Sequence, residues 1–343
     1  MNRNVLFYFS LIVVILGVTS CGKRESSEKT ESDRQVSKKV FAFYYGWYGN
    51  PEVSEQWIHW RDVNKEEKNI GGSINYPELG PYDSRNPEVV EQHCSWAKQV
   101  GIDVFIASWF GPNEITDKSL PVVLESAKKK DLKVTAYYET TDDSKEQGLK
   151  YLNYLLDNYT DHPAWLKING QPVVFVYGRA VNEIGLDGWK WMIQEVNEQR
   201  SQDVIFIGDR ISKEASEIFH GLHTYNITGA IQGKSTQEIR KWAGKNYPEW
   251  VTIAGDKISC LTIIPGFDDT ELDRPEPRPT TSRHNGETYR ILWEEAIAAN
   301  PEWILITSFN EWHEGSEIEP SVENGDRALN ITEKFTDKFK TND

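Results

Sequence analysis

The chain has 343 residues, 38% of them hydrophobic, which is enough for one large domain with a substantial core rather than several small domains. Its formal net charge of −15 argues against a nucleic-acid partner, because phosphate contacts require positive charge. The 13 Trp and 15 Tyr residues suit either a packed core or a carbohydrate groove, since flat rings match the apolar faces of sugars.

The N-terminus has the pattern of a targeting segment. Residues 1–20 contain one Arg and then an apolar stretch that is short for a membrane span. They end in Val-Thr-Ser directly before Cys21, which resembles the lipobox of bacterial lipoproteins, where the Cys carries the lipid. A simple secretory signal or an anchor helix is the alternative. We therefore expect a signal peptide at 1–20, a lipidated Cys21, and a protein held at a bacterial cell envelope through this anchor alone.

Behind this Cys the composition changes twice. Residues 21–39 are charged and rich in Ser, so they are predicted to form a flexible tether, and the folded domain is expected at 40–343. Cys94 and Cys260 are the two further cysteines, too few for a disulfide framework, and they form either one bridge or two buried thiols. We expect the domain to be a monomer.

Eight short apolar runs, rich in β-branched and aromatic residues, alternate with amphipathic segments. The runs lie at residues 40–45, 103–108, 133–138, 173–177, 204–208, 219–225, 260–266 and 303–308. Helical patterns between them lie at residues 87–101, 119–132, 189–200, 235–246 and 287–300. This alternation predicts a single (β/α)8 TIM-type barrel with its active site at the C-terminal face of the strands. A doubly wound open sheet is the alternative, but no G-x-G-x-x-G pattern follows the first strand.

Aromatic and acidic residues follow nearly every predicted strand, where barrel enzymes carry their catalytic groups. In chain order they are Tyr45 to Tyr48, Trp109 and Phe110, Glu139, Tyr177, Asp209, His223 and Tyr225, Asp268 and Asp269, and Asn310 to Glu314. Lys and Arg are scarce at these positions, which disfavours a phosphate or carboxylate substrate.

The segment SFNEWHEGSEIEP at 308–320 places four carboxylates directly after the last predicted strand. Glu311 and Glu314 are three residues apart and would share one face of a helical turn. Two carboxyls in unequal surroundings suit glycoside hydrolysis, which needs one protonated and one ionised. A solvated acidic helix start is the alternative. Metal binding by His313 and its acidic neighbours is disfavoured, because no second His lies nearby as in H-E-x-x-H.

Several further strings accompany this segment between Val40 and Lys338, namely FYYGWYGNPE, HWRD, INYPELGPYDSRNP, the Glu of AYYE, GLHTYN, IIPGFDD and SRHNG. Together they resemble glycoside hydrolase family 99, the endo-α-1,2-mannosidases and bacterial endo-α-1,2-mannanases. The resemblance implies a (β/α)8 barrel that needs no metal and no cofactor. It also implies cleavage of an internal α-mannosidic bond with retention of configuration.

The resemblance further implies individual roles. Glu311 corresponds to a base and Glu314 to the acid/base on the glycosidic oxygen. On this reading Glu311 deprotonates O2 of the cleaved mannose, and a 1,2-anhydro sugar forms. The positions expected to bind the sugar or hold the carboxylates are Tyr45, His59, Trp60, Trp109, Phe110, Glu139, Tyr225, Asn310 and His313. For the flanking aromatic residues, packing at the barrel mouth is the alternative.

The chain also departs from the family pattern. Phe110 stands where bacterial members often carry a second Trp, the loop between Trp60 and Tyr76 is short, and the segment after Pro320 is trimmed. These changes leave the exact glycan open. The expected partner is an α-mannan or a mannose-containing oligosaccharide. Two alternatives are a non-catalytic lipoprotein that captures glycans and a hydrolase of a different or decorated α-glycan.

Overall fold

The structure is a computed structural model that describes residues 36–275 and 278–341. The predicted signal peptide, Cys21 and most of the predicted tether lie outside the described residues. The chain from Val36 onward forms one compact unit, and its first strand begins at Lys39, next to the predicted domain start.

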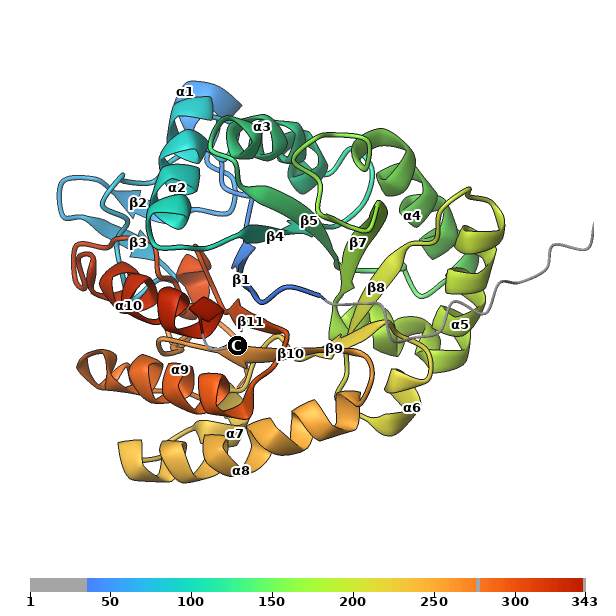
Figure 1. Ribbon diagram of the computed structural model, residues 1–343. Coiled ribbons are helices and arrows are strands. Elements are labelled where there is room, and N and C mark those ends of the chain that lie inside the picture. The colour runs from blue at the N-terminus through green and yellow to red at the C-terminus, as the bar shows by residue number, and fades with distance from the viewer. Residues whose placement is uncertain (1–35, 276–277, 342–343) are drawn as a thin grey trace, which may run out of the picture. The chain divides into compact units, whose positions relative to one another are not determined.

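Eight parallel strands form a closed barrel (Figure 1). Around the barrel they are β1 (Lys39–Tyr44), β4 (Val104–Trp109), β5 (Lys133–Tyr138), β7 (Gln171–Val176), β8 (Ile205–Asp209), β9 (Gly221–His223), β10 (Ile258–Ile263) and β11 (Trp303–Ile306). Pairing of β11 with β1 closes the ring, in the register Lys39 to Trp303. Every predicted strand is found, and the (β/α)8 prediction is confirmed.

Helices surround the strands on the outside, as Figure 1 shows. The long ones are α2 (Pro87–Gln99), α3 (Ile115–Lys129), α4 (Lys145–Tyr159), α5 (Gly178–Glu198), α8 (Thr236–Ala254), α9 (Glu287–Ala299) and α10 (Arg327–Thr341). The short ones are α1 (Pro51–Ser54), α6 (Lys213–Ser216), α7 (Thr228–Ile231), η2 (His284–Gly286) and η3 (Trp312–Glu314). Three small strands complete the fold, an antiparallel pair β2 (Arg61–Asn64) and β3 (Asn69–Gly71), and β6 (Lys167–Ile168) beside β7.

The helix α8 runs further than its sequence pattern predicts. The predicted helix ends at Asn246, whereas the observed helix continues to Ala254 through Pro248, which lacks one backbone donor. Tyr247 is fully buried, and its hydroxyl donates to the carbonyl of Thr262 at 2.7 Å. Tertiary packing therefore outweighs the local cost of Pro248.

Side chains alternate between two apolar layers along each strand, as the pleat requires. One layer fills the barrel, where Phe41 lies 4.6 Å from Trp303, ring to ring. The other layer packs the strands against the helices. Cys94 and Cys260 are both buried and unpaired, so of the two expectations the buried thiols are confirmed. Within the described part of the chain, no helix is both long and apolar enough to span a membrane.

Candidate active site

The segment that follows β11 is held by residues that follow the neighbouring strand β1. The side-chain amide of Asn310 accepts a hydrogen bond from the backbone N–H of Tyr45 at 2.7 Å and donates to the carbonyl of Tyr45 at 2.9 Å. The hydroxyl of Tyr48 bridges the Asn310 carbonyl at 3.2 Å and the Trp312 N–H at 3.1 Å. Asn310 is fully buried, and its hydrogen bonds fix the acidic turn to the segment that follows β1.

Glu311 and Glu314 lie on and beside the short helix η3 at the C-terminal face of the barrel. Glu311 is 3% exposed and accepts a hydrogen bond from the N–H of His313 at 3.2 Å. Glu314 accepts a hydrogen bond from the Tyr225 hydroxyl at 2.6 Å, which joins the ends of two different strands. The two predicted catalytic acids thus lie on the same turn, and Tyr225 is hydrogen-bonded to Glu314.

Their protonation follows from burial. Desolvation raises the pKa of Glu314 to about 7, while the Tyr225 hydrogen bond and the charge of Arg274 act in the opposite direction. Desolvation also raises the pKa of Glu311, and the negative charge of Glu314 raises it further. Both carboxyls therefore keep their protons to a higher pH than a solvated glutamate, and a state with one protonated and one ionised member is compatible with neutral pH.

A third carboxylate, Glu139, lies just beyond the end of β5 and is 4% exposed. Its side chain accepts hydrogen bonds from the Ser108 hydroxyl at 2.7 Å and from the Arg179 guanidinium at 3.3 Å. Arg179 also lies over the rings of Phe110 and Tyr177, at 5.1 and 5.5 Å from their centroids. Glu139 is thereby a rigid acceptor at the mouth of the barrel.

Glu139 makes a pH-dependent contribution to stability that can be measured. Desolvation raises its pKa from 4.5 to about 7, against the Ser108 hydrogen bond and the Arg179 charge. Between these pH values the unfolded chain binds fewer protons than the folded one, so stability falls as pH rises through about 7. At pH 8 we expect Glu139→Gln to have a higher Tm than the wild type and a free energy of unfolding larger by up to about 3 kcal/mol. At pH 4 the two proteins should melt at nearly the same temperature. Arg179 is half exposed and can be solvated without its partner. An unchanged or lower Tm at pH 8 would contradict the cause assigned here.

The predicted residues His59 and Trp60 have different surroundings. Trp60 is buried, stacks on Tyr48 at 3.9 Å and donates from its indole to the carbonyl of Tyr82 at 2.6 Å. Trp60 therefore packs in the interior beside the site and is not open to solvent. His59 is exposed, and its ring lies 4.2 Å from that of Trp47 and 4.8 Å from that of His313. His59 therefore faces the opening of the site.

Trp109 is not where we expected it. Its side chain is fully buried, its indole donates to Asp117 at 2.9 Å, and its ring lies in the layer between strands and helices beside Tyr138. The reason is the alternation of the strand: Ser108 points inward to Glu139, so Trp109 must point outward. Phe110 is partly exposed, next to Trp47 with 6.0 Å between ring centroids, and stays at the mouth of the barrel.

Three arginines near the site were missed, because strand ends alone suggested that basic residues are scarce there. Arg179 comes from the start of α5, three residues beyond the end of β7, and this closeness to a strand end was a signal for it. Arg61 begins the short strand β2 and belongs to the string HWRD, whereas Arg274 lies in the loop after β10, where no local pattern marks it. Their charges act on His313, whose pKa burial first lowers and these two charges lower further, to about 4. His313 is therefore neutral at physiological pH.

Three side chains in the site have the donor types of a metal centre. One ligand atom each from His59, Glu311 and His313 lies within 4.8 Å of the others. No second His lies near His313 in the sequence, but the fold supplies His59 from the beginning of the domain.

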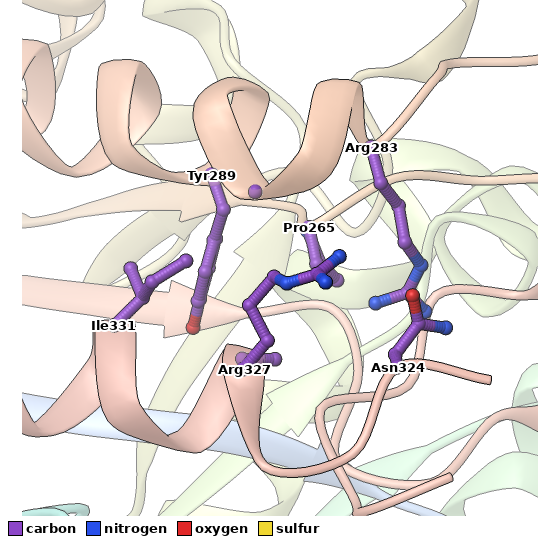
Figure 2. A pocket seen from close by; sticks show the side chains of 8 residues that line it. Pro265, Arg283, Tyr289, Asn324, Arg327 and Ile331 are labelled. Carbon is purple, nitrogen blue, oxygen red and sulfur yellow. The ribbon is translucent and has the colours of Figure 1, made fainter. Parts of the chain in front are cut away.

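A separate pocket of about 20 Å³, lined by residues such as Arg283 and Arg327, is shown in Figure 2. It has room for about one water and not for a sugar.

Comparisons with known proteins point to one family. The model of glycosyl hydrolase family 99 matches residues 35–334. Glycoprotein endo-alpha-1,2-mannosidase of Rattus norvegicus is 31% identical, over 89% of this chain and 73% of the rat protein. The Mus musculus protein of the same name is 30% identical, over 89% and 73%. A solved structure of the GH99 endo-alpha-mannosidase from Bacteroides thetaiotaomicron superposes with a TM-score of 0.74 at 27% identity, covering 88% of this chain and 98% of that one. The family resemblance is confirmed, and the chain belongs to glycosyl hydrolase family 99 and is a glycoside hydrolase.

Proposed function

We propose that the protein is an endo-acting α-mannan hydrolase of the endo-α-1,2-mannosidase and mannanase type, which retains configuration through a 1,2-anhydro sugar. The observation that carries the proposal is the placement of Glu311 and Glu314 on one short turn at the barrel mouth, with Tyr225 bonded to Glu314. The similar rat and bacterial proteins are named as endo-alpha-mannosidases, which supports the substrate class.

The shared turn argues against direct attack by a carboxylate. An ordinary retaining enzyme uses two carboxyls about 5 to 5.5 Å apart, one of which attacks the anomeric carbon. Two acids from one tight turn are hard to place on opposite sides of a sugar ring. In α-mannose the axial O2 lies trans to the leaving group and can itself attack C1.

In the first step Glu311 accepts the proton of O2, and O2 bonds to C1. The bond from C1 to the leaving oxygen breaks as Glu314 donates its proton to that oxygen. In the second step water bonds to C1 from the vacated face while Glu314 accepts its proton. The C1–O2 bond breaks as the bond to water forms, and O2 regains the proton held by Glu311. Two inversions at C1 give net retention, and both acids return to their starting states.

The test is incubation of the purified protein with a panel of α-mannans of defined linkage, followed by NMR of the first products. We expect internal cleavage of an α-1,2-containing mannan, with the α-anomer formed first. Release of single mannose units or a first-formed β-anomer would contradict the proposal. Tight binding without any product would instead identify a protein that captures glycans.

Phe110 is expected to border the sugar next to the cleaved bond. Replacing it by Trp should change KM by several-fold between substrates that differ at that sugar, with a smaller change in kcat, because a stacking contact acts mainly on binding. The matched control is Trp109→Phe, which removes the bond to Asp117. That variant should lower Tm and leave KM unchanged. A change in KM caused by Trp109→Phe and not by Phe110→Trp would reverse these assignments.

The N-terminal anchor is a separate part of the proposal. We expect the protein to be bound to a bacterial cell envelope through lipid on Cys21, because the preceding Val-Thr-Ser resembles a lipobox and the sequence that follows is charged and rich in Ser. Cys21→Ala should move the protein from the membrane fraction to the soluble fraction. Retention of the variant by membranes would contradict lipid anchoring.

A further inference from the structure

His59, Glu311 and His313 form a cluster that we call the imidazole–carboxylate seat. One donor atom from each lies within 4.8 Å of the others, and the Nδ1 of His313 is 3.8 Å from a carboxylate oxygen of Glu311. Two imidazoles and one carboxylate are a donor set that Zn²⁺ uses in open sites, where a fourth position is left to water or another ligand.

The seat contains polar atoms that nothing in the described protein satisfies. His313 is 4% exposed and neither of its ring nitrogens has a hydrogen-bond partner among the described residues. The second carboxylate oxygen of Glu311 is likewise buried and unpartnered within residues 36–275 and 278–341. Buried polar atoms are normally paired, because each unpaired one costs about 1 to 3 kcal/mol. These atoms are therefore available to bind a ligand.

The seat is open to solvent on one side, and its donor atoms lie further apart than in a metal site. His59 keeps part of its surface exposed while its ring packs against Trp47 at 4.2 Å, so an ion reaches the cluster from this side. Bonds of about 2.1 Å in a tetrahedral site bring donor atoms to about 3.4 Å from one another. The present spacing of up to 4.8 Å therefore has to shorten when a metal binds.

Charge around the seat selects the kind of ion. The carboxylates Glu311 and Glu314 attract a cation, whereas the guanidinium groups of Arg61 and Arg274 oppose one. Hard ions such as Mg²⁺ and Ca²⁺ depend on clustered carboxylate oxygens and gain little here. Zn²⁺ and Cu²⁺ bind neutral imidazole strongly and tolerate this balance better.

We infer that the imidazole–carboxylate seat binds one divalent transition-metal ion of the Zn²⁺ and Cu²⁺ class, and that the bound ion blocks the active site. A metal bonded to the Glu311 carboxylate removes it as a proton acceptor and fills space at the mouth of the barrel. The binding part stands independently of the proposed function. The inhibition part rests on the assignment of Glu311 as the base.

Zn²⁺ binding is measured first without any substrate, by isothermal titration calorimetry and by Tm with and without ZnCl2. We expect one Zn²⁺ per chain and a rise in Tm, since an ion that binds only the folded state stabilises it. His59→Asn should weaken Zn²⁺ affinity by at least about 100-fold, more than the loss of an outer-shell partner causes. Asn is chosen because His59 has a φ of 65°, which Asn tolerates. His313→Gln should have the same effect.

The matched control is His162→Gln, which alters another His–carboxylate pair, with His162 2.9 Å from Glu125 and away from the barrel mouth. It should leave Zn²⁺ affinity and activity unchanged. MgCl2 should neither bind nor stabilise. Hydrolysis by the wild type should fall as Zn²⁺ fills the seat and return with a chelator. Absence of Zn²⁺ binding, or binding that survives both His59→Asn and His313→Gln, would overturn the inference. Binding without inhibition would retain the seat and contradict the role of Glu311.

Discussion

Glu311→Gln is expected to lower kcat by at least about 10⁴-fold on a natural oligosaccharide and on an activated aryl mannoside alike. That is the upper end of what acid–base catalysis contributes, and it applies to both substrates because no attacking O2 forms without the base. The amide has the size of the carboxyl, so its oxygen can still accept the hydrogen bond from the N–H of His313. In the wild type this N–H lies 3.2 Å from the carboxylate oxygen of Glu311. The measurement is kcat on both substrates, with Tm to show that the variant is folded.

The same hypothesis predicts the behaviour of altered substrates. A mannoside that is deoxygenated or methylated at O2 should bind and yet remain uncleaved by the wild type, because its nucleophile is absent. Binding is followed by calorimetry and cleavage by product analysis. Brisk hydrolysis of the 2-deoxy substrate, or a covalent sugar found on Glu311 by mass spectrometry, would restore direct attack by the carboxylate.

Glu314→Gln is expected to separate the two kinds of substrate. On an oligosaccharide, whose leaving oxygen needs a proton, kcat should fall by about 10² to 10⁴-fold. On an aryl mannoside with a good leaving group the first step should be spared, because that oxygen leaves without protonation. The Tyr225 hydroxyl, which is 2.6 Å from Glu314, can still donate to the amide oxygen, so the turn should keep its shape.

The outcome is read from the ratio of the two rates. A loss on the oligosaccharide at least ten times larger than the loss on the activated substrate would assign Glu314 as the acid. Equal losses on both would remove that role. Tyr225→Phe is a matched control that removes the hydrogen bond and keeps the carboxyl, and it should produce a smaller loss than Glu314→Gln.

The barrel and the catalytic pair could be predicted from the sequence because both depend on local information. Each strand is a short apolar run, and its bounds follow from composition, as β5 at Lys133–Tyr138 illustrates. Glu311 and Glu314 belong to one continuous segment directly after β11, so their proximity needed no knowledge of the fold. The barrel geometry then placed that segment at the C-terminal face.

Tertiary structure decided what no single segment encodes. Whether Trp109 or its neighbours face the site depends on the phase of alternation in β4, and the hydrogen bond from Ser108 to Glu139, just beyond β5, shows which phase the fold adopts. Arg61, from β2, and Arg274, from the loop after β10, reach the site from outside the eight barrel strands. Closure of the barrel brings the ends of all eight strands to one face, and this places His59, from the beginning of the domain, beside His313, from its end. Contacts of that kind come from ring closure between distant strands, so they appear only when the chain is folded.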